Sequence, residues 1–298
     1  MEGQIGSLPD GSPWDLAAER RGDRDWIEDQ WHSPDSRVVL MYDGQVAVDS
    51  DDRPLWMSSG RLPDDVLAWA FLGIDAHGCA RFVASAAPAT ALNVDDWLPL
   101  RSLPSELAAE LFSAVSLMNW HANHTHCPRC GAATSIHEAG WQRVCPEDNS
   151  RHFPRVDPAV IMLIHDGFDR VLLGRHKRWP VGWFSTLAGF VEPGETLADA
   201  VVREVAEEVG LQVVETTYLG SQSWPFPNSL MVGFHARAEY AAPQPDGDEI
   251  EEAHWLTREE LASSSAAGTI KLPPALSISR WLIQQWYGEE LPGEWART

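Results

Sequence analysis

Three carboxylates are spaced so that one helix would carry them side by side. Glu204, Glu207 and Glu208 stand three and four residues apart in a segment otherwise rich in Val and Ala. Residues three or four apart share one helix face, and carboxylates crowded there raise each other's pKa unless a cation neutralises them. Such oxygen ligands suit Mg²⁺ or Mn²⁺, completed by water and by phosphate oxygens of a substrate. The alternative is an acidic face that water solvates.

Signals at both ends predict a helix over about residues 197–209. Thr196 can cap its first turn together with Asp199, and Gly210 suits the left-handed residue that follows a helix. The loop before the helix contains Gly194, which permits a tight turn that returns Glu195 to the helix start.

The segment that contains this helix resembles the Nudix box. The box reads Gly-x5-Glu-x7-Arg-Glu-U-x-Glu-Glu-x-Gly-U, with U aliphatic, and residues 189–211 match it at every specified position. Nudix hydrolases use the box to bind divalent cations and to attack a diphosphate attached to a nucleoside-like group. The resemblance implies an α+β fold, the Nudix α/β/α sandwich with a mixed sheet. It makes Glu204, Glu207 and Glu208 catalytic metal ligands, adds Glu195 as a support of the metal cluster, and gives Arg203 the role of positioning a carboxylate.

An aromatic and proline-rich stretch follows about ten residues after the box. It reads Ser-Gln-Ser-Trp-Pro-Phe-Pro-Asn-Ser over residues 221–229. Proline removes backbone freedom, so Trp224 and Phe226 could be held as a stacking platform for a planar base. The alternative is an ordinary loop anchored by buried aromatic side chains.

This stretch resembles the motif Ser-Gln-Pro-Trp-Pro-Phe-Pro-x-Ser of NADH pyrophosphatases of the NudC type. Eight of the nine residues are compatible, and the departure is Ser223, where that family has proline. The resemblance implies that Gln222, Trp224, Phe226 and Ser229 bind the substrate.

Four further positions resemble the same family. Phe153 begins a match to the family's Tyr-Pro-Arg-x-x-Pro-x-x-Ile entry into the first Nudix strand, and Phe190 matches an aromatic residue that stacks on adenine. Ser279 replaces an Ala that lines the nucleotide pocket, and Glu249 matches an acidic residue that reaches the metal site. Without the resemblance, Phe190 reads as a core residue and Glu249 as a solvated one.

Cys127, Cys130 and Cys145 lie within 19 residues, in a segment with little aliphatic sequence. Two cysteines separated by two residues fit one tetrahedral zinc ion. A second such pair would place a cysteine at position 148, where this chain has Asp148. The fourth ligand of a structural Zn²⁺ is then Asp148 or one of His124, His126 and His152, unless the metal has been lost.

Length and charge limit the remaining possibilities. The 298 residues suggest about two domains, and the composition changes over residues 121–155. Together with the resemblance, this implies an N-terminal α+β domain (1–120), a zinc-ribbon module (121–155) and a Nudix domain (156–298). The formal net charge of −22 opposes generic nucleic-acid binding. There is no leader-like start and no apolar run long enough to cross a membrane, so we expect a cytoplasmic protein.

Hydrophobic patterning predicts the elements that position these groups. Expected strands are 38–41, 67–72, 82–83, 159–164, 171–173, 212–219 and 230–236, with 159–164 and 171–173 forming a hairpin, and expected helices are 103–120, 197–209 and 277–287.

The resemblance implies hydrolysis of the diphosphate of NADH or NAD⁺ to AMP and nicotinamide mononucleotide by a homodimer. NAD-capped RNA has the same scissile bond, and residues 121–155 carry four Arg against three acids, so it is a further candidate substrate. The alternatives are a Nudix pyrophosphatase for ADP-ribose or dinucleoside polyphosphates, and a nucleotide sensor without catalytic activity. The general base is either a glutamate of the helix or Glu249.

Overall fold

The computed structural model describes residues 13–63, 65–86, 96–293 and 295, and these form two compact units. The N-terminal unit contains the described residues up to Val156 together with Trp224–Asn228. The C-terminal unit contains Asp157–Ser223 and the described residues from Ser229 onward. The three-part division at residues 120 and 155 stays a prediction, since the cysteine-rich segment belongs to the N-terminal unit.

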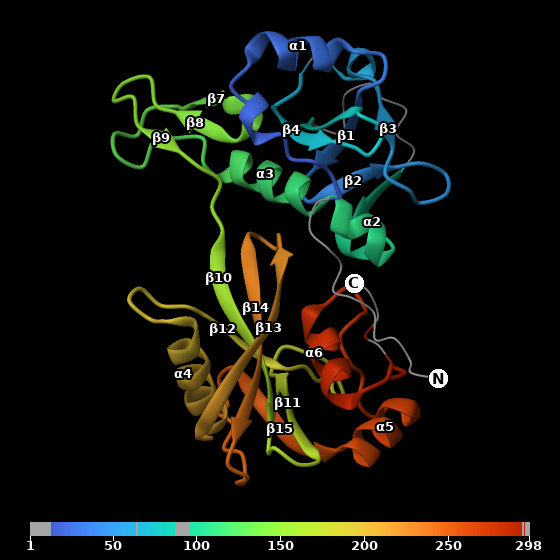
Figure 1. The fold of residues 1–298 in the computed structure, drawn as a ribbon, viewed down its shortest axis with the longest axis vertical. Helices are drawn as coiled ribbons and strands as arrows, with labels where there is room; N and C mark the ends of the chain where they lie inside the picture. The colour runs from blue at the N-terminus through green and yellow to red at the C-terminus, as the bar shows by residue number, and fades with distance from the viewer. Residues whose placement is uncertain (1–12, 64, 87–95, 294, 296–298) are drawn as a thin grey trace. The chain divides into compact units, whose positions relative to one another are not determined.

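The N-terminal unit is built on a six-stranded sheet in the order β4-β5-β1-β2-β6, with β3 also paired to β1 (Figure 1). Its strands are β1 (Arg37–Tyr42), β2 (Gln45–Val48), β3 (Trp56–Met57), β4 (Ala68–Ile74), β5 (Ala80–Ser85) and β6 (Asp96–Pro99). Its helices are η1 (Ala18–Arg20), α1 (Arg24–His32), η2 (Ser59–Arg61), η3 (Leu100–Ser102), α2 (Ser105–Glu110) and α3 (Phe112–Asn123). The strands expected over 38–41, 67–72 and 82–83 correspond to β1, β4 and β5.

The helix expected over 103–120 is two helices. Leu111, between α2 and α3, has φ −100° and ψ 3°, and its N–H donates to Ala108 O at 3.1 Å. Such an i→i+3 bond tightens the last turn of a helix, and the fully buried Leu111 side chain holds the break in place. The spacing of apolar residues over 103–120 was therefore informative about which side chains are buried, but it did not predict the interruption of the helix at Leu111.

The cysteine-rich segment forms a small three-stranded sheet, β7 (Ser135–His137), β8 (Gln142–Val144) and β9 (Arg151–His152), with η4 (Glu138–Gly140) between β7 and β8. It is docked on β4 through close backbone contact. A Cβ added at Gly140, where φ is +93°, would lie 2.4 Å from the Ala70 Cβ, so only glycine fits. Trp141 Nε1 donates to Phe71 O at 2.6 Å and fixes the same turn.

The C-terminal unit contains a mixed sheet in the order β13-β14-β10-β11-β15, with β12 also paired to β10. Its strands are β10 (Asp157–His165), β11 (Arg170–His176), β12 (Leu187–Phe190), β13 (Val213–Trp224), β14 (Ser229–Ala238) and β15 (Ile250–Thr257). β10 is parallel to β14 and antiparallel to β11 and β12. The predicted hairpin of β10 and β11 is thus confirmed.

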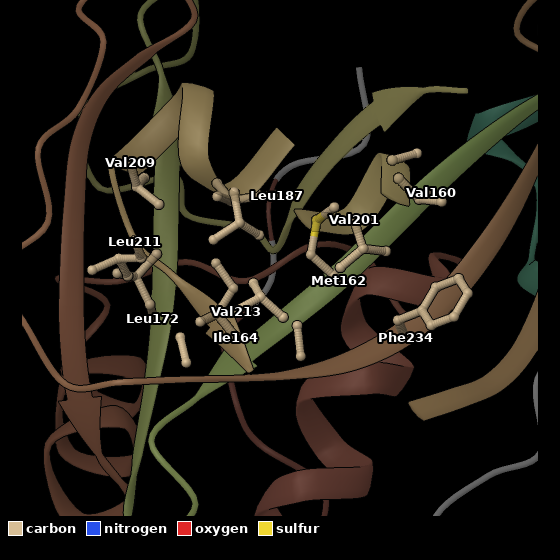
Figure 2. Close-up of a cluster of buried hydrophobic side chains, with 14 of the residues drawn as sticks. Val160, Met162, Ile164, Leu172, Leu187, Val201, Val209, Leu211, Val213 and Phe234 are labelled. Carbon is tan, nitrogen blue, oxygen red and sulfur yellow. The ribbon is translucent and has the colours of Figure 1, made fainter. Parts of the chain in front are cut away.

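Successive side chains of β10 point to opposite faces of the sheet, and each face has its own core with helices. Figure 2 shows the core that contains Val160, Met162 and Ile164. Val160, Met162 and Ile164 pack with α4 (Leu197–Val209), whereas Ile161 and Leu163 join a core with α5 (Arg258–Ala267) and α6 (Ile278–Tyr287). This is the expected α/β/α sandwich with a mixed sheet. The predicted helices at 197–209 and 277–287 are confirmed as α4 and α6, and β12, β15 and α5 were not predicted. None of the described helices is both long and apolar enough to cross a bilayer.

Candidate metal centre

Local sequence fixes both ends of α4. Thr196 Oγ1 accepts from Asp199 N at 3.2 Å, and the Asp199 carboxylate accepts from Thr196 N at 3.3 Å. Gly210 ends the helix in the left-handed region, at φ +67°. The apolar face of α4 is buried in the core, so its opposite face presents the acidic side chains.

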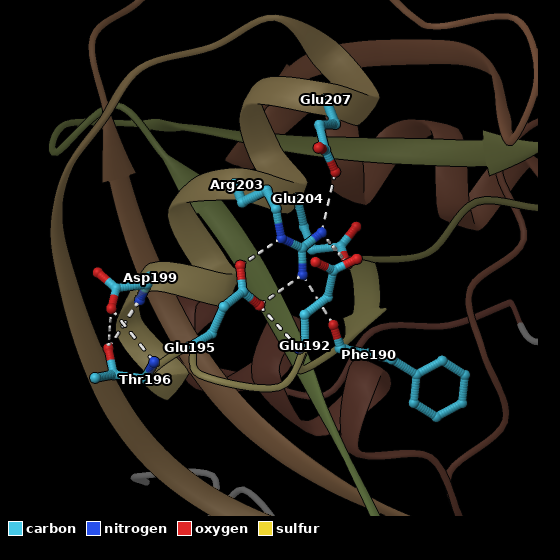
Figure 3. A network of polar contacts seen from close by, with 8 residues as sticks. All are labelled: Phe190, Glu192, Glu195, Thr196, Asp199, Arg203, Glu204 and Glu207. Carbon is cyan, nitrogen blue, oxygen red and sulfur yellow. Dashed lines mark hydrogen bonds and ion pairs between the residues drawn. The ribbon is translucent and has the colours of Figure 1, made fainter.

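Arg203 is the centre of a network that joins these carboxylates (Figure 3). Its guanidinium donates to both Glu195 oxygens at 2.6 and 2.9 Å, to Glu204 at 2.8 Å and to Glu207 at 3.0 Å. A fifth bond goes to Phe190 O at 2.9 Å, which attaches the network to the end of β12. The sequence predicted that Arg203 positions one carboxylate, and in the structure it contacts the carboxylates of three residues, Glu195, Glu204 and Glu207.

Glu195 is held as an anion by this network. The Arg203 hydrogen bonds, supported by a backbone N–H donated by Glu192, lower the Glu195 pKa to about 2. Gly194, at φ +100°, makes the turn that precedes it. Glu195 therefore balances the charge of Arg203 and fixes its orientation toward Glu204 and Glu207.

Glu208 carries a buried carboxylate. The residue is 5% exposed, and its Oε2 has no hydrogen-bond partner among the residues that the structure describes. Burial, followed by repulsion from Glu204, Glu249, Asp246 and Glu207, raises its pKa to about 9. A buried, unpaired carboxylate costs free energy unless a cation or a proton neutralises it. The arrangement therefore fits a divalent cation with oxygen ligands.

Glu204 lies directly against β12. A Cβ added at Gly189 would lie 1.9 Å from the Glu204 carboxyl group, so glycine at 189 leaves room for the carboxylate beside the strand. Burial, opposed by Arg203, raises the Glu204 pKa. Its carboxylate is thus positioned from two sides, by the β12 backbone and by Arg203.

A tight turn before β15 presents Glu249 to the same cluster. The Asp246 carboxylate accepts from the N–H groups of Glu249 and Ile250 at 3.2 and 2.9 Å. Asp246 N donates to Glu208 O at 3.1 Å, which connects the turn to α4. Sequence reasoning missed Asp246, although Asp-Gly-Asp at 246–248 is a turn signal.

The metal-free protein is expected to lose stability as pH rises toward 9. Folded Glu208 keeps its proton up to about pH 9, whereas an unfolded glutamic acid releases it near its ordinary pKa. Protonation thus stabilises the fold fully below the unfolded pKa, and this contribution is lost as pH rises through the folded pKa. One proton gives a slope of up to about 1.4 kcal/mol per pH unit. Urea unfolding between pH 6 and 9, without Mg²⁺ or Mn²⁺ and with zinc retained, measures it.

Glu208→Gln should flatten this pH dependence, because an amide does not titrate. Glu215→Gln, at an exposed glutamate paired with Arg237, is the matched control and should keep the wild-type slope. A Glu208→Gln slope equal to that of wild type would show that Glu208 is ionised in the folded protein.

The predicted substrate-binding residues differ in exposure. Phe153 and Phe190 are 63% and 58% exposed, and the Phe190 ring points away from the Arg203 network (Figure 3). Gln222 is buried, and its amide donates to Leu276 O at 2.7 Å and accepts from Ile278 N at 2.9 Å. Gln222 therefore ties β13 to the start of α6.

Ser279 is also buried. Its hydroxyl accepts from Thr186 Oγ1 at 2.8 Å and from Thr186 N at 3.2 Å, and lies 2.7 Å from Ser185 Oγ. Ser229 is buried at the start of β14, in register with Asp157. The hydrogen bonds of Ser279 tie the start of α6 to the residues just before β12. Trp224 and Phe226 belong to the N-terminal unit, whereas the carboxylates belong to the C-terminal unit.

The three cysteines and Asp148 form a second candidate metal site. One ligand atom from each lies within 4.8 Å of the others, as tetrahedral zinc requires of its donors. Cys130 Sγ and Cys145 Sγ are 3.4 Å apart, and Cys127 Sγ lies 3.7 Å from Asp148 Oδ2. Among the described residues, no other group of three or more His, Cys, Asp or Glu side chains brings its ligand atoms this close together. The group contains no histidine.

Ser150 supports this group. Its hydroxyl and its N–H both donate to Asp148 Oδ1, at 2.5 and 2.9 Å, and these bonds are the main cause of a lowered Asp148 pKa. Ser150 Oγ is also 3.4 Å from Cys127 Sγ, and this contact lowers the pKa of the Cys127 thiol. Ser150 thus favours the deprotonated forms that bind zinc.

Asp148→Ala is expected to lower zinc affinity by at least about tenfold, the lower end of what losing a supporting hydrogen bond costs a zinc site. Asp148→Cys should keep or raise the affinity, because thiolate suits zinc well. Zinc content by mass spectrometry during titration with a chromogenic chelator measures both. Glu147→Ala, at the exposed neighbouring residue, is the control. Equal zinc retention in Asp148→Ala and Glu147→Ala would exclude Asp148 as a ligand.

Two domain families match the chain. The NUDIX domain matches residues 155–276, and the NADH pyrophosphatase zinc ribbon domain matches residues 122–153. The first contains the α4 carboxylates, and the second contains the Cys127 cluster.

Individual relatives match over longer stretches. "NAD-capped RNA hydrolase NudC" of Mycobacterium tuberculosis (strain H37Ra) is 48% identical over 183 residues, 58% of this chain and 58% of the relative. "NAD-capped RNA hydrolase NUDT12" of Pongo abelii is 39% identical over 277 residues, 87% of this chain and 59% of the relative. The chain therefore spans less than two thirds of the length of these relatives. A solved NUDIX hydrolase from Nitrosomonas europaea, 21% identical, covers 56% of this chain and 96% of its own, with a TM-score of 0.44.

Proposed function

Since residues 155–276 form a Nudix domain and residues 122–153 an NADH pyrophosphatase zinc ribbon domain, we propose that this protein hydrolyses the diphosphate of NADH or NAD⁺. The products are AMP and nicotinamide mononucleotide, reduced or oxidised. The observation that carries the proposal is the buried Glu208 carboxylate, unpaired beside Glu204 and close enough to Glu249 to be repelled by it.

The proposed catalytic group is Arg203, Glu204, Glu207, Glu208 and Glu249, with Glu195 as support. These carboxylates would hold Mg²⁺ or Mn²⁺, which supplies charge neutralisation for the phosphates and lowers the pKa of water. Arg203 keeps Glu204 and Glu207 in place through its hydrogen bonds. The general base that takes the proton of the attacking water is a glutamate of α4 or Glu249.

We assign substrate binding to Phe153, Phe190, Gln222, Trp224, Phe226, Ser229 and Ser279. The exposed Phe190 ring is suited to stacking on a base. The polar groups of Gln222 and Ser279 already have partners within the protein. These two residues would therefore contribute by fixing the position of α6 rather than by contacting the substrate. Zn²⁺ held by Cys127, Cys130, Cys145 and Asp148 would have a structural role, because these four residues would supply all the ligands of a tetrahedral site. The proposed active form is a homodimer.

NAD-capped RNA is a second proposed substrate, and the names of the relatives support it. The bond to be cleaved is the same, and only the 3′ side of the adenosine is extended. Increasing salt should reduce RNA cleavage more than NADH cleavage if the RNA chain itself is bound electrostatically.

Product analysis tests the proposal. Purified protein with Mg²⁺ or Mn²⁺ should convert NADH to AMP and reduced nicotinamide mononucleotide, faster than it cleaves ADP-ribose or diadenosine polyphosphates. Preference for either of the latter would reassign the substrate. Tight NAD⁺ binding without turnover of any of them would indicate a sensor.

A further inference from the structure

The segment Trp224–Asn228, which begins with the last residue of β13, belongs to the N-terminal unit, although β14 and the rest of β13 lie in the C-terminal unit. The chain leaves the C-terminal unit after Ser223 and returns to it at Ser229. We call Trp224–Asn228 the aromatic loop. Its place in the N-terminal unit raises the question of which side chains hold it there.

Asn119, on α3, holds the loop backbone. Its Nδ2 donates to Pro225 O at 3.1 Å and to Pro227 O at 3.4 Å. A single amide group therefore bridges the two carbonyl groups on either side of Phe226. Proline lacks an N–H group, so the carbonyl oxygens of Pro225 and Pro227 are the backbone groups that these residues offer to a partner.

Arg101, in η3, holds the loop side chains. Its guanidinium carbon lies 4.1 Å from the centroid of the Phe226 ring and 5.6 Å from that of Trp224. The two rings meet edge to face, with centroids 5.3 Å apart. A guanidinium over an aromatic face is attracted by the ring quadrupole. Arg101 thus fixes the rings, while Asn119 fixes the backbone between them.

We propose that Arg101 and Asn119 are positioning residues that set the affinity for the dinucleotide by holding the aromatic loop in its binding conformation. This inference rests on the proposed function, which assigns Trp224 and Phe226 to substrate binding. Ordering a loop before binding removes an entropic cost from the binding step. Neither residue belongs to the proposed catalytic group, so the expected effect is on substrate binding and not on the chemical step. The N-terminal unit thereby acquires a role in substrate selection.

Asn119→Asp tests the backbone contact, because Asp has nearly the same size but offers no donor to the carbonyl groups of Pro225 and Pro227. Arg101→Gln tests the ring contact. Each variant should raise KM for NADH about fivefold, the cost of one hydrogen bond or one cation–π contact, with kcat within about twofold of wild type. Arg101→Lys keeps a cation and should restore most of the affinity.

Asn123→Ala and Arg61→Gln are the matched controls. Asn123 lies one turn beyond Asn119 and donates to the Asn119 carbonyl group, and Arg61 is exposed elsewhere in the N-terminal unit. Both should keep the wild-type KM. Hydrogen exchange of a peptide covering residues 222–230 gives a readout independent of activity, and it should become faster in Asn119→Asp and Arg101→Gln alone.

The outcomes separate the two hypotheses. If wild-type protein cleaves no dinucleotide, the proposed function fails, while hydrogen exchange still tests whether Arg101 and Asn119 hold the loop. If wild type is active but exchange in the loop is unchanged in the variants, the positioning role is wrong. Faster exchange with an unchanged KM, or a fall in kcat alone, would also overturn the inference, because the loop would then not govern affinity.

Discussion

Glu207→Gln should reduce kcat for NADH hydrolysis by about 10³-fold, since losing a ligand that holds the cation removes several kcal/mol of charge stabilisation. The fold should be unaffected. The Glu207 side chain is 62% exposed and forms an ion pair with Arg203, and an ion pair this exposed contributes little stability. Steady-state kinetics with product analysis, together with thermal unfolding, measure both quantities.

Glu259→Gln is the control for this experiment, because Glu259 is an exposed glutamate in the first turn of α5. It should leave kcat and the melting temperature unchanged. Retention of more than about a tenth of wild-type kcat in Glu207→Gln would show that Glu207 is not a catalytic metal ligand. The base and the ligands would then be confined to Glu204, Glu208 and Glu249.

Arg203→Lys should reduce kcat by about 100-fold, as changes in residues that orient metal ligands commonly do. Lysine keeps the positive charge, but it cannot donate in two parallel bonds to Glu195 while also reaching Glu204, Glu207 and Phe190 O. The carboxylates would remain but lose their common orientation. Mn²⁺ affinity measured by electron paramagnetic resonance should fall together with kcat.

Arg258→Lys is the matched control. Arg258 also bridges several groups, since it donates to Asp169 and to Trp286 O, but it is not part of the carboxylate network. It should keep wild-type kcat and Mn²⁺ affinity, even if some stability is lost. Wild-type kinetics in Arg203→Lys would mean that charge alone, without the fork of hydrogen bonds, is sufficient to organise the site.

The sequence predicted α4 to the residue because its boundary signals are local. Thr196 and Asp199 satisfy the first turn, and Gly210 adopts the left-handed conformation after the last. The 3.6-residue period placed the three glutamates on one face and the valines on the other. Each of these inferences involves residues within one turn of each other, so no knowledge of the remaining chain was required.

Features that depend on distant residues could not be predicted in the same way. The spacing of Glu208 gives its helix face but not its burial, which arises from the sheet and from the Asp246 turn. β15 carries Glu251, Glu252 and His254 among its apolar residues, and its acidic composition resembles a solvated loop. The contacts of Arg101 and Asn119 with the aromatic loop join residues more than 100 positions apart. No local sequence pattern predicts such contacts.

The candidate zinc site depends on both local and distant residues. The spacing of Cys127 and Cys130 is a local signal, but whether Asp148 or a histidine completes the set depends on how the segment folds. The β8–β9 turn brings Asp148 toward the thiols with the help of Ser150. His124 instead contacts Trp120 O, and His126 contacts Thr125 Oγ1.

The membership of the aromatic loop in the N-terminal unit has a consequence for synthesis on the ribosome. Chains emerge from the N-terminus first, and domains fold as units while they emerge. The N-terminal unit has all its residues up to Val156 well before Trp224–Asn228 are made. Arg101 and Asn119 therefore lack their contacts with the aromatic loop until that part of the chain has been synthesised. Completion of the first unit thus depends on the translation of the second.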